Sequence, residues 1–153
     1  MAMTTYTGTL KELGPSVEQA SERIGSKQYA YIEFTDGQIL RNICVVGGVD
    51  GKLDAALDDQ GQITLHIMHG GKAADLLVAV KTCDGKTFAT DLGGGSLLGY
   101  GIVAGNVLLG LGFLPLFGIG LIFLWLAWRS WHGIRLVETA KTYVRSLPNV
   151  IFV

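Results

Sequence analysis

Charged side chains are missing from one long stretch of this sequence, because no Asp, Glu, Lys or Arg occurs from Leu92 to Trp128. About 18 mainly apolar residues without charge already suggest a helix that crosses a bilayer. A chain of 153 residues also leaves little protein to cover such a run as the central helix of a soluble bundle. The sequence therefore predicts an integral membrane protein.

The N-terminus lacks the cationic start and apolar core of a cleaved signal peptide. We therefore expect residues 1–92 to stay in the cytoplasm, where Cys44 and Cys83 are free thiols rather than a disulfide. Residues 1–92 carry a net charge of -4. Since binding to phosphate needs a basic surface, this charge argues against nucleic acid as a partner.

Short runs of β-branched and aromatic residues fill much of the segment 1–92 and are typical of strands. Asp-Gly pairs at Asp36 and Asp84 separate such runs and predict hairpin turns. A capping-box spacing that starts at Ser16 predicts one short amphipathic helix. The Gly- and Asp-rich segment 47–61 is expected to be a long loop or one helical turn. The N-terminal part is therefore expected to be a small antiparallel, β-rich and barrel-like domain with one short helix.

Several residues resemble functional sites, but each group has a simpler interpretation. His66 and His69 could join Cys44 and Cys83 as metal ligands, but residues three apart on a strand point to opposite faces. The acidic segment 50–59 lacks the ligand spacing of an EF-hand loop. No nucleophile stands beside a base in the sequence, and no pair of carboxylates lies in an apolar setting. We therefore expect no catalytic residue, no metal, no cofactor and no enzymatic activity.

The length of the uncharged run favours two membrane crossings over one. A single helix from Gly95 to Trp128 would be about 51 Å long, and a hydrocarbon core of about 30 Å would force a tilt beyond the usual range. A break near Pro115 gives two helices of about 26 Å each. Two crossings also keep the basic tail on the cytoplasmic side. A single crossing and a re-entrant turn stay open as alternatives.

Two groups of residues in this region are expected to contact partners. Four glycines fall within about 20° of one line on a helix, and such a smooth stripe lets a helix of the same hairpin or of another subunit approach closely. Aromatic and basic residues near the end of the second span are typical of a membrane interface. The stripe consists of Gly94, Gly101, Gly105 and Gly112, and the interface group consists of Trp125, Trp128, Arg129, Trp131 and Arg135.

The predicted fold class is α+β, with the β-rich domain over residues 1–92, a transmembrane helical hairpin over 93–131, and a basic amphipathic helix in the tail 132–153. We expect an integral protein of the bacterial inner membrane, with the domain and the tail in the cytoplasm. Its predicted role is a homo-oligomeric scaffold that displays a docking or sensing domain, and the alternative is an oligomeric pore formed by the hairpins. The expected partners are the lipid bilayer, other copies of the chain and a protein that binds the domain.

Overall fold

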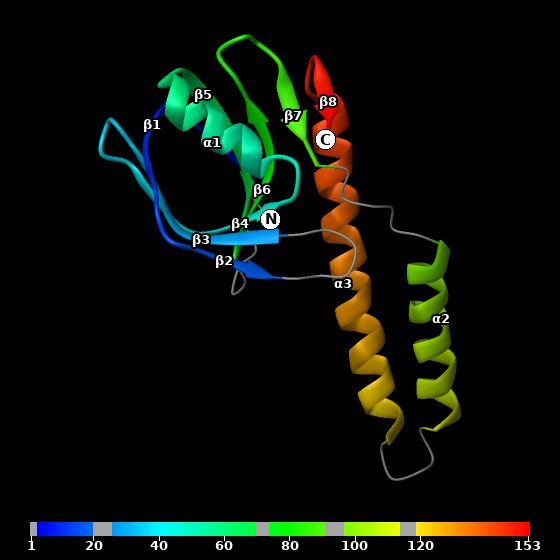
Figure 1. The fold of residues 1–153 in the computed structure, drawn as a ribbon. Helices are drawn as coiled ribbons and strands as arrows, with labels where there is room; N and C mark the ends of the chain where they lie inside the picture. Colours follow the sequence, from blue (N-terminus) through cyan, green and yellow to red (C-terminus); the bar gives the residue numbers. More distant parts are fainter. Residues whose placement is uncertain (1–2, 20–25, 70–73, 91–96, 114–118) are drawn as a thin grey trace. The chain divides into compact units, whose positions relative to one another are not determined.

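The computed structural model describes residues 3–19, 26–69, 74–90, 97–113 and 119–153, which are coloured in Figure 1. The chain divides into two units: unit 1 comprises Met1–Asp91 and Val144–Val153, and unit 2 comprises Leu92–Tyr143. The division into a domain at 1–92, a hairpin at 93–131 and a tail at 132–153 stays a prediction.

Within the described residues, unit 1 holds one sheet of eight strands and a helix between the fourth and fifth strands. The strands are β1 (Met3–Leu13), β2 (Ser16–Gln19), β3 (Ser26–Phe34), β4 (Ile39–Val46), β5 (Gln62–Met68), β6 (Asp75–Lys81), β7 (Thr87–Ala89) and β8 (Val150–Phe152). The helix is α1 (Asp50–Asp59).

Five of these strands close into a ring (Figure 1). The sheet follows the order β2-β3-β1-β5-β6-β7-β8, and β4 pairs with both β3 and β6. The β4–β6 pairing is parallel, from Ile43 opposite Asp75 to Val45 opposite Leu77, whereas the other pairs within the ring are antiparallel. Strand β8 adds to the sheet in parallel with β7, so the C-terminal residues are part of unit 1.

The ring encloses the apolar core, because alternate residues of each strand point inward. Helix α1 adds Leu53 and Ala56 to the same core, and Val49 precedes them at the helix start. The largest fully buried side chains in this core are Phe34, Ile32, Ile43, Leu53, Ile63, Leu65, Ile67 and Leu77. Burial of each such side chain stabilises the fold by roughly 1.5–3 kcal/mol before conformational entropy is subtracted.

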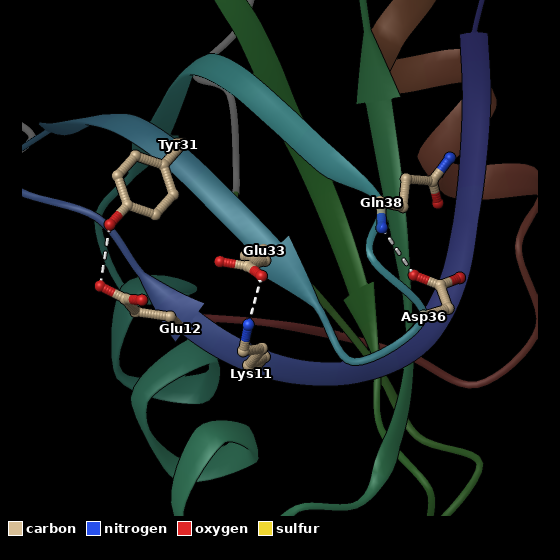
Figure 2. A network of polar contacts seen from close by, with 6 residues as sticks. All are labelled: Lys11, Glu12, Tyr31, Glu33, Asp36 and Gln38. Atoms are coloured by element: carbon tan, nitrogen blue, oxygen red, sulfur yellow. Dashed lines mark hydrogen bonds and ion pairs between the residues drawn. The ribbon is translucent and has the colours of Figure 1, made fainter.

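The predicted hairpin turns are confirmed. Strands β3 and β4 pair in antiparallel fashion across Asp36 and Gly37, and β6 and β7 do the same across the second Asp-Gly pair. Gly37 has a φ of 87°, which favours glycine, and the backbone N–H of Gln38 donates to Asp36 Oδ1 at 2.9 Å (Figure 2). These turns could be predicted because their chemistry is local.

Two local predictions in unit 1 were wrong. Ser16 does not begin a helix, because residues Ser16–Gln19 form β2 and pair with the edge of β3. Val17, whose side chain would belong to the apolar face of a helix at this place, has an exposed fraction of 67%. The segment 47–61 is not a long loop or a single helical turn, because it contains the ten-residue helix α1. Leu53 and Ala56 are three residues apart, so in a helix both side chains lie on the side that faces the core.

Unit 2 contains two helices, α2 (Leu97–Gly112) and α3 (Ile119–Ser146), and α3 runs on into unit 1. The amphipathic helix predicted for the tail is therefore the second half of α3 rather than a separate element. After Pro148 the chain forms β8, a strand that the sequence analysis did not predict.

The predicted transmembrane hairpin is wrong, because neither of these helices, nor any other in the described residues, combines the length and the hydrophobicity needed for a bilayer crossing. Helix α2 has 16 residues and spans about 24 Å, which is less than the roughly 30 Å of a hydrocarbon core. Helix α3 is longer, but the charged residue Arg129 lies only about 15 Å along the helix from its start at Ile119, so its uncharged part is shorter than a hydrocarbon core.

This finding also corrects the predictions that depended on the hairpin. An integral protein of the bacterial inner membrane that displays a cytoplasmic domain is not supported, and neither is a pore built from membrane-spanning hairpins. The uncharged run from Leu92 to Trp128 is real, but a count of apolar residues does not reveal where helices begin and end. The fold class reduces to α+β with a closed ring of five strands and, among the described residues, three helices.

The close approach of β1 to the core predicts that Gly8→Ala destabilises the protein. An added Cβ at Gly8 would lie 2.8 Å from Cδ1 of Phe34, whose side chain is fully buried and has no room to move. We expect the free energy of unfolding to fall by about 1–3 kcal/mol, measured by urea unfolding with circular dichroism. The matched control is Gly51→Ala in α1, where a Cβ meets nothing within 4 Å among the described residues. Equal midpoints for the two variants would contradict the prediction.

Candidate functional site

Helices α2 and α3 pack against each other in antiparallel directions, as Figure 1 shows. Near the end of α2 the rings of Phe113 and Phe123 stack with centroids 6.1 Å apart. Near its start the hydroxyl of Tyr100 donates to the carboxylate of Glu138, and the rings of Tyr100 and Trp131 pack in a T-shaped arrangement with centroids 6.1 Å apart. Contacts at both ends therefore hold α2 against α3.

Glycines outside the predicted stripe allow this close packing. A Cβ at Gly110 would lie 2.7 Å from Cγ of Leu124 and 3.1 Å from the carbonyl oxygen of Gly120. A Cβ at Gly99 would lie 3.4 Å from Cδ1 of Ile134. The smallest side chain is therefore required at Gly110, where the backbones of α2 and α3 nearly touch.

The predicted stripe lies on the opposite side of α2. At 100° per residue, Gly101, Gly105 and Gly112 project about 180–220° around the helix from Gly110. A Cβ at any of these three positions would meet nothing within 4 Å among the described residues. Gly94, the fourth member of the stripe, lies outside the described residues. The stripe is thus not used by α3, and its three described glycines leave a strip without side chains on the outer side of α2, which we call the groove.

Large apolar side chains flank this groove. Leu108 and Leu109 project about 40–60° to either side of the stripe, and their exposed fractions are 71% and 46%. We call the groove and its flanks the outer face of α2, which consists of Gly101, Ile102, Gly105, Leu108, Leu109 and Gly112. No charged side chain lies on this face.

The residues predicted for a membrane interface all lie on α3 and form pairs along it. The guanidinium of Arg129 lies 5.6 Å from the ring centre of Trp125, and that of Arg135 lies 5.1 Å from the ring centre of Trp131. Trp128 contacts the ring of His132 in an edge-on arrangement at 4.8 Å. These cation–π and ring contacts explain the spacing of the five residues without a bilayer.

Unit 1 contains a row of three polar side chains that the sequence analysis missed. Thr4 Oγ1 lies 2.9 Å from Nε2 of His69, and Nδ1 of the same ring lies 2.8 Å from Oδ2 of Asp75. Thr4 belongs to β1, His69 follows β5 directly, and Asp75 begins β6. No sequence motif could have indicated this row, because Thr4 is 65 positions from His69.

A second polar cluster connects β3 with the start of α1. Asp50 accepts a hydrogen bond from the hydroxyl of Tyr29 at 2.5 Å and forms an ion pair with Lys27, also at 2.5 Å. Burial and this hydrogen bond raise the pKa of Tyr29, so the phenol stays protonated at neutral pH. Both partners of Asp50 hold it in place, which makes this cluster an anchor for the helix rather than a reactive site.

The outward surface of β1 and β3 carries ordinary exposed pairs (Figure 2). Lys11 forms an ion pair with Glu33 at 2.6 Å, and the hydroxyl of Tyr31 donates to Glu12 at 2.8 Å. Exposed pairs of this kind contribute at most about 1 kcal/mol to stability. The two pairs connect β1 with β3, and each of their four side chains is engaged by its partner.

A small cleft of about 170 Å³ lies between α1 and the β6–β7 turn. The ammonium group of Lys52 lies 4.5 Å from the centre of the Phe88 ring on its wall. Cys83 also lines the cleft, and its thiol donates to the carboxylate of Asp84 at 3.7 Å. This contact joins neighbouring residues of the exposed β6–β7 turn, and no third group that would orient the carboxylate lies on it in the described residues that line the cleft.

The histidines considered as metal ligands have separate environments. His66 is buried and His69 is half-buried in the polar row. In the described part of the chain, no three His, Cys, Asp or Glu side chains lie close enough together to hold a metal ion. The expectation of a protein without metal or cofactor stays a prediction.

No protein-family model matches the chain, and no curated protein or solved structure matches it. Two features of the described residues could serve a function: the outer face of α2 and the row of Thr4, His69 and Asp75.

The packing of α2 on α3 predicts that Gly110→Ala weakens the helical hairpin. The added Cβ would clash with Leu124 and with the backbone of Gly120, which offsets the better helix propensity of alanine. We expect a lower thermal midpoint by circular dichroism. The control is Gly133→Ala in α3, where a Cβ meets nothing within 4 Å among the described residues, so propensity alone should act. A midpoint for Gly110→Ala at or above that of Gly133→Ala would contradict the packing.

Burial of His66 predicts a loss of stability in acid. Burial lowers the pKa of His66 below its ordinary value of 6.5, and the positive charge of Lys81 lowers it further. The unfolded chain takes up a proton near pH 6.5 while the folded chain does not, so the free energy of unfolding falls as the pH drops below about 6.5. The free energy of unfolding, measured in urea between about pH 7.5 and 5.5, should depend less on pH in His66→Gln than in the wild-type protein. The variant of the exposed His132, His132→Gln, should keep the original slope, and equal slopes for all three proteins would contradict the prediction.

Proposed function

We propose that this protein functions as a self-assembling protein, in which the outer face of α2 of one copy packs against the same face of a second copy. The observation that carries this proposal is the uncharged groove of Gly101, Gly105 and Gly112, flanked by the exposed side chains of Leu108 and Leu109. Each assembly would bring several copies of unit 1 together.

The amount of exposed apolar surface supports an obligatory partner. The large apolar side chains of unit 2 that are exposed present on the order of 1,000 Å², since one aromatic side chain alone spans about 150–250 Å². A monomer seldom exposes an apolar patch of more than a few hundred Å². An interface of standard size buries roughly 800 Å² on each partner, so contacts that together cover both helices, rather than α2 alone, reach this size.

The chemistry of the outer face of α2 favours a second copy as the occupant. A two-fold contact places the same surface on both sides, so that surface must be complementary to itself. An uncharged face meets this condition, because no like charges are brought together. The groove and its flanks also match in shape, since Leu108 of one copy can enter the space above Gly105 of the other and the two backbones can approach closely.

The remaining surface of the hairpin suggests more than two copies. Leu121 and Ile122 at the start of α3 have exposed fractions of 61% and 60%, and they do not belong to the outer face of α2. A contact through α2 would leave them exposed. A closed assembly with a second contact along α3 would cover them as well, with Trp125 and Trp128 as large contact residues.

Sedimentation of the full chain tests the proposal. The wild-type protein should form a defined oligomer, and Leu108→Glu should raise its dissociation constant about 100-fold or more, because an apolar contact worth roughly 1.5–3 kcal/mol is lost and a charge is buried. Gly105→Leu should act in the same direction by filling the groove. Val17→Glu is the matched control, since Val17 has an exposed fraction of 67% but lies on β2.

Two outcomes would overturn the proposal. The first is a wild-type chain that stays monomeric, and the second is an oligomer that Leu108→Glu leaves as stable as Val17→Glu does. Co-sedimentation of a monomeric wild-type chain with phosphatidylcholine vesicles would assign the apolar surface to lipid instead. Circular dichroism of each variant confirms that its helices are still formed.

A further inference from the structure

We propose that Thr4, His69 and Asp75 form an acyl-transfer site, in which the Thr4 hydroxyl takes the acyl group of a small uncharged carboxylic ester and then passes it to water. All three residues belong to unit 1, so this activity is separate from self-assembly through α2. It departs from the expectation of a protein without enzymatic activity, which was based on sequence motifs alone.

The hydrogen bonds determine the direction of proton transfer along the row. A carboxylate can only accept, so Nδ1 of His69 carries the ring proton and donates it to Asp75 at 2.8 Å. In the neutral ring Nε2 is then the acceptor, and it lies 2.9 Å from Thr4 Oγ1. The hydroxyl therefore donates to a base that is held in the tautomer needed to remove its proton.

This arrangement has the parts of an activated nucleophile: a hydroxyl, a base within hydrogen-bond reach, and a third group that orients the base. Thr4 is the nucleophile and His69 is the general base, whereas Asp75 is a positioning residue because it acts on the reaction through the His69 ring. Three different strand ends supply these groups, and the β1–β5 and β5–β6 pairings hold them in register.

Access and surroundings indicate the class of substrate. The side chain of His69 has an exposed fraction of 37%, so a small molecule can reach the base from solvent. Thr4 lies opposite Ile67 in the β1–β5 register, and residues opposite each other share one face of the sheet. This face is the apolar interior of the ring, which favours a short uncharged acyl group over a charged phosphoryl group.

The reaction balances with water as the only co-reactant. In the first step a bond forms between Thr4 Oγ1 and the acyl carbon, the bond from that carbon to the leaving oxygen breaks, and the hydroxyl proton passes through His69 Nε2 to the leaving oxygen. In the second step water adds to the acyl carbon and gives a proton to His69 Nε2, the bond from the acyl carbon to Thr4 Oγ1 breaks, and Nε2 returns the proton to Oγ1. The Thr4 hydroxyl is restored and a carboxylic acid is released.

A neighbouring threonine offers a matched control. Thr7 lies on the same strand, and its hydroxyl pairs with the hydroxyl of Thr64 at 3.0 Å rather than with an imidazole. Both hydroxyls belong to threonines of β1, but only that of Thr4 has an imidazole beside it. A reaction that needs His69 should occur at Thr4 and not at Thr7.

Hydrolysis of p-nitrophenyl acetate by the full chain tests the site, with mass spectrometry to locate the acetyl group. We expect the wild-type protein to release p-nitrophenol above the buffer rate and to carry a transient acetyl group on Thr4. Thr4→Val and His69→Gln should lose about 100-fold or more of the rate, while Thr4→Ser and Thr7→Val should keep it. Asp75→Asn should lower kcat and leave KM unchanged, because Asp75 does not touch the ester.

The outcomes separate the site from an ordinary hydrogen-bonded cluster. Hydrolysis by Thr4→Val at the wild-type rate would overturn the proposal, as would an acetyl group on His69 or on a lysine instead of Thr4. A wild-type rate equal to that of buffer would also overturn it. Circular dichroism of Thr4→Val, which has nearly the same shape as the wild type, shows that a lost rate does not reflect unfolding.

Discussion

The parallel pairing of β4 with β6 is the contact on which the structure of unit 1 depends. The other strand pairs form an open path, and only this pairing joins β3 back to β6 through β4. Without it, Val45 and Leu77 would lie at open edges, although both are fully buried. The same closure leaves α1 as the connection from β4 to β5, where Leu53 fills the core inside the ring. One short run of paired residues thus determines both the core and the position of the helix.

The polar row of unit 1 is a consequence of the same closure. Asp75 begins β6 opposite Ile43 of β4, and His69 follows the strand that pairs with β6 on its other side. Thr4 reaches this place from β1, the neighbour of β5. Groups that are distant in the sequence therefore meet where several strands end. Strand ends are suited to chemistry, because a side chain there can stay partly open to solvent while the strands keep it in position.

Glycine has two opposite uses in unit 2. At Gly110 the missing side chain lets α2 contact α3, and any added atom would meet Leu124. At Gly101 and Gly105 the missing side chain leaves a groove that α3 does not fill. The direction in which each glycine points decides between these uses, and that direction depends on where the neighbouring helix lies. The inward glycines hold the hairpin together, and the outward ones leave a surface for a second copy.

Local signals in the sequence were enough for the strands around the Asp-Gly turns, since alternation and turn chemistry act over a few residues. They were also enough to place Gly101, Gly105 and Gly112 in a helix. Only the tertiary structure decided that Ser16 starts a strand, because the free edge of β3 outweighs a helical pattern of one or two turns. Only the tertiary structure showed that α2 is too short for a bilayer crossing, and only it brought Thr4 to His69. In each of these cases the deciding partner is far away in the sequence, so pairing and burial, rather than local propensity, set the outcome.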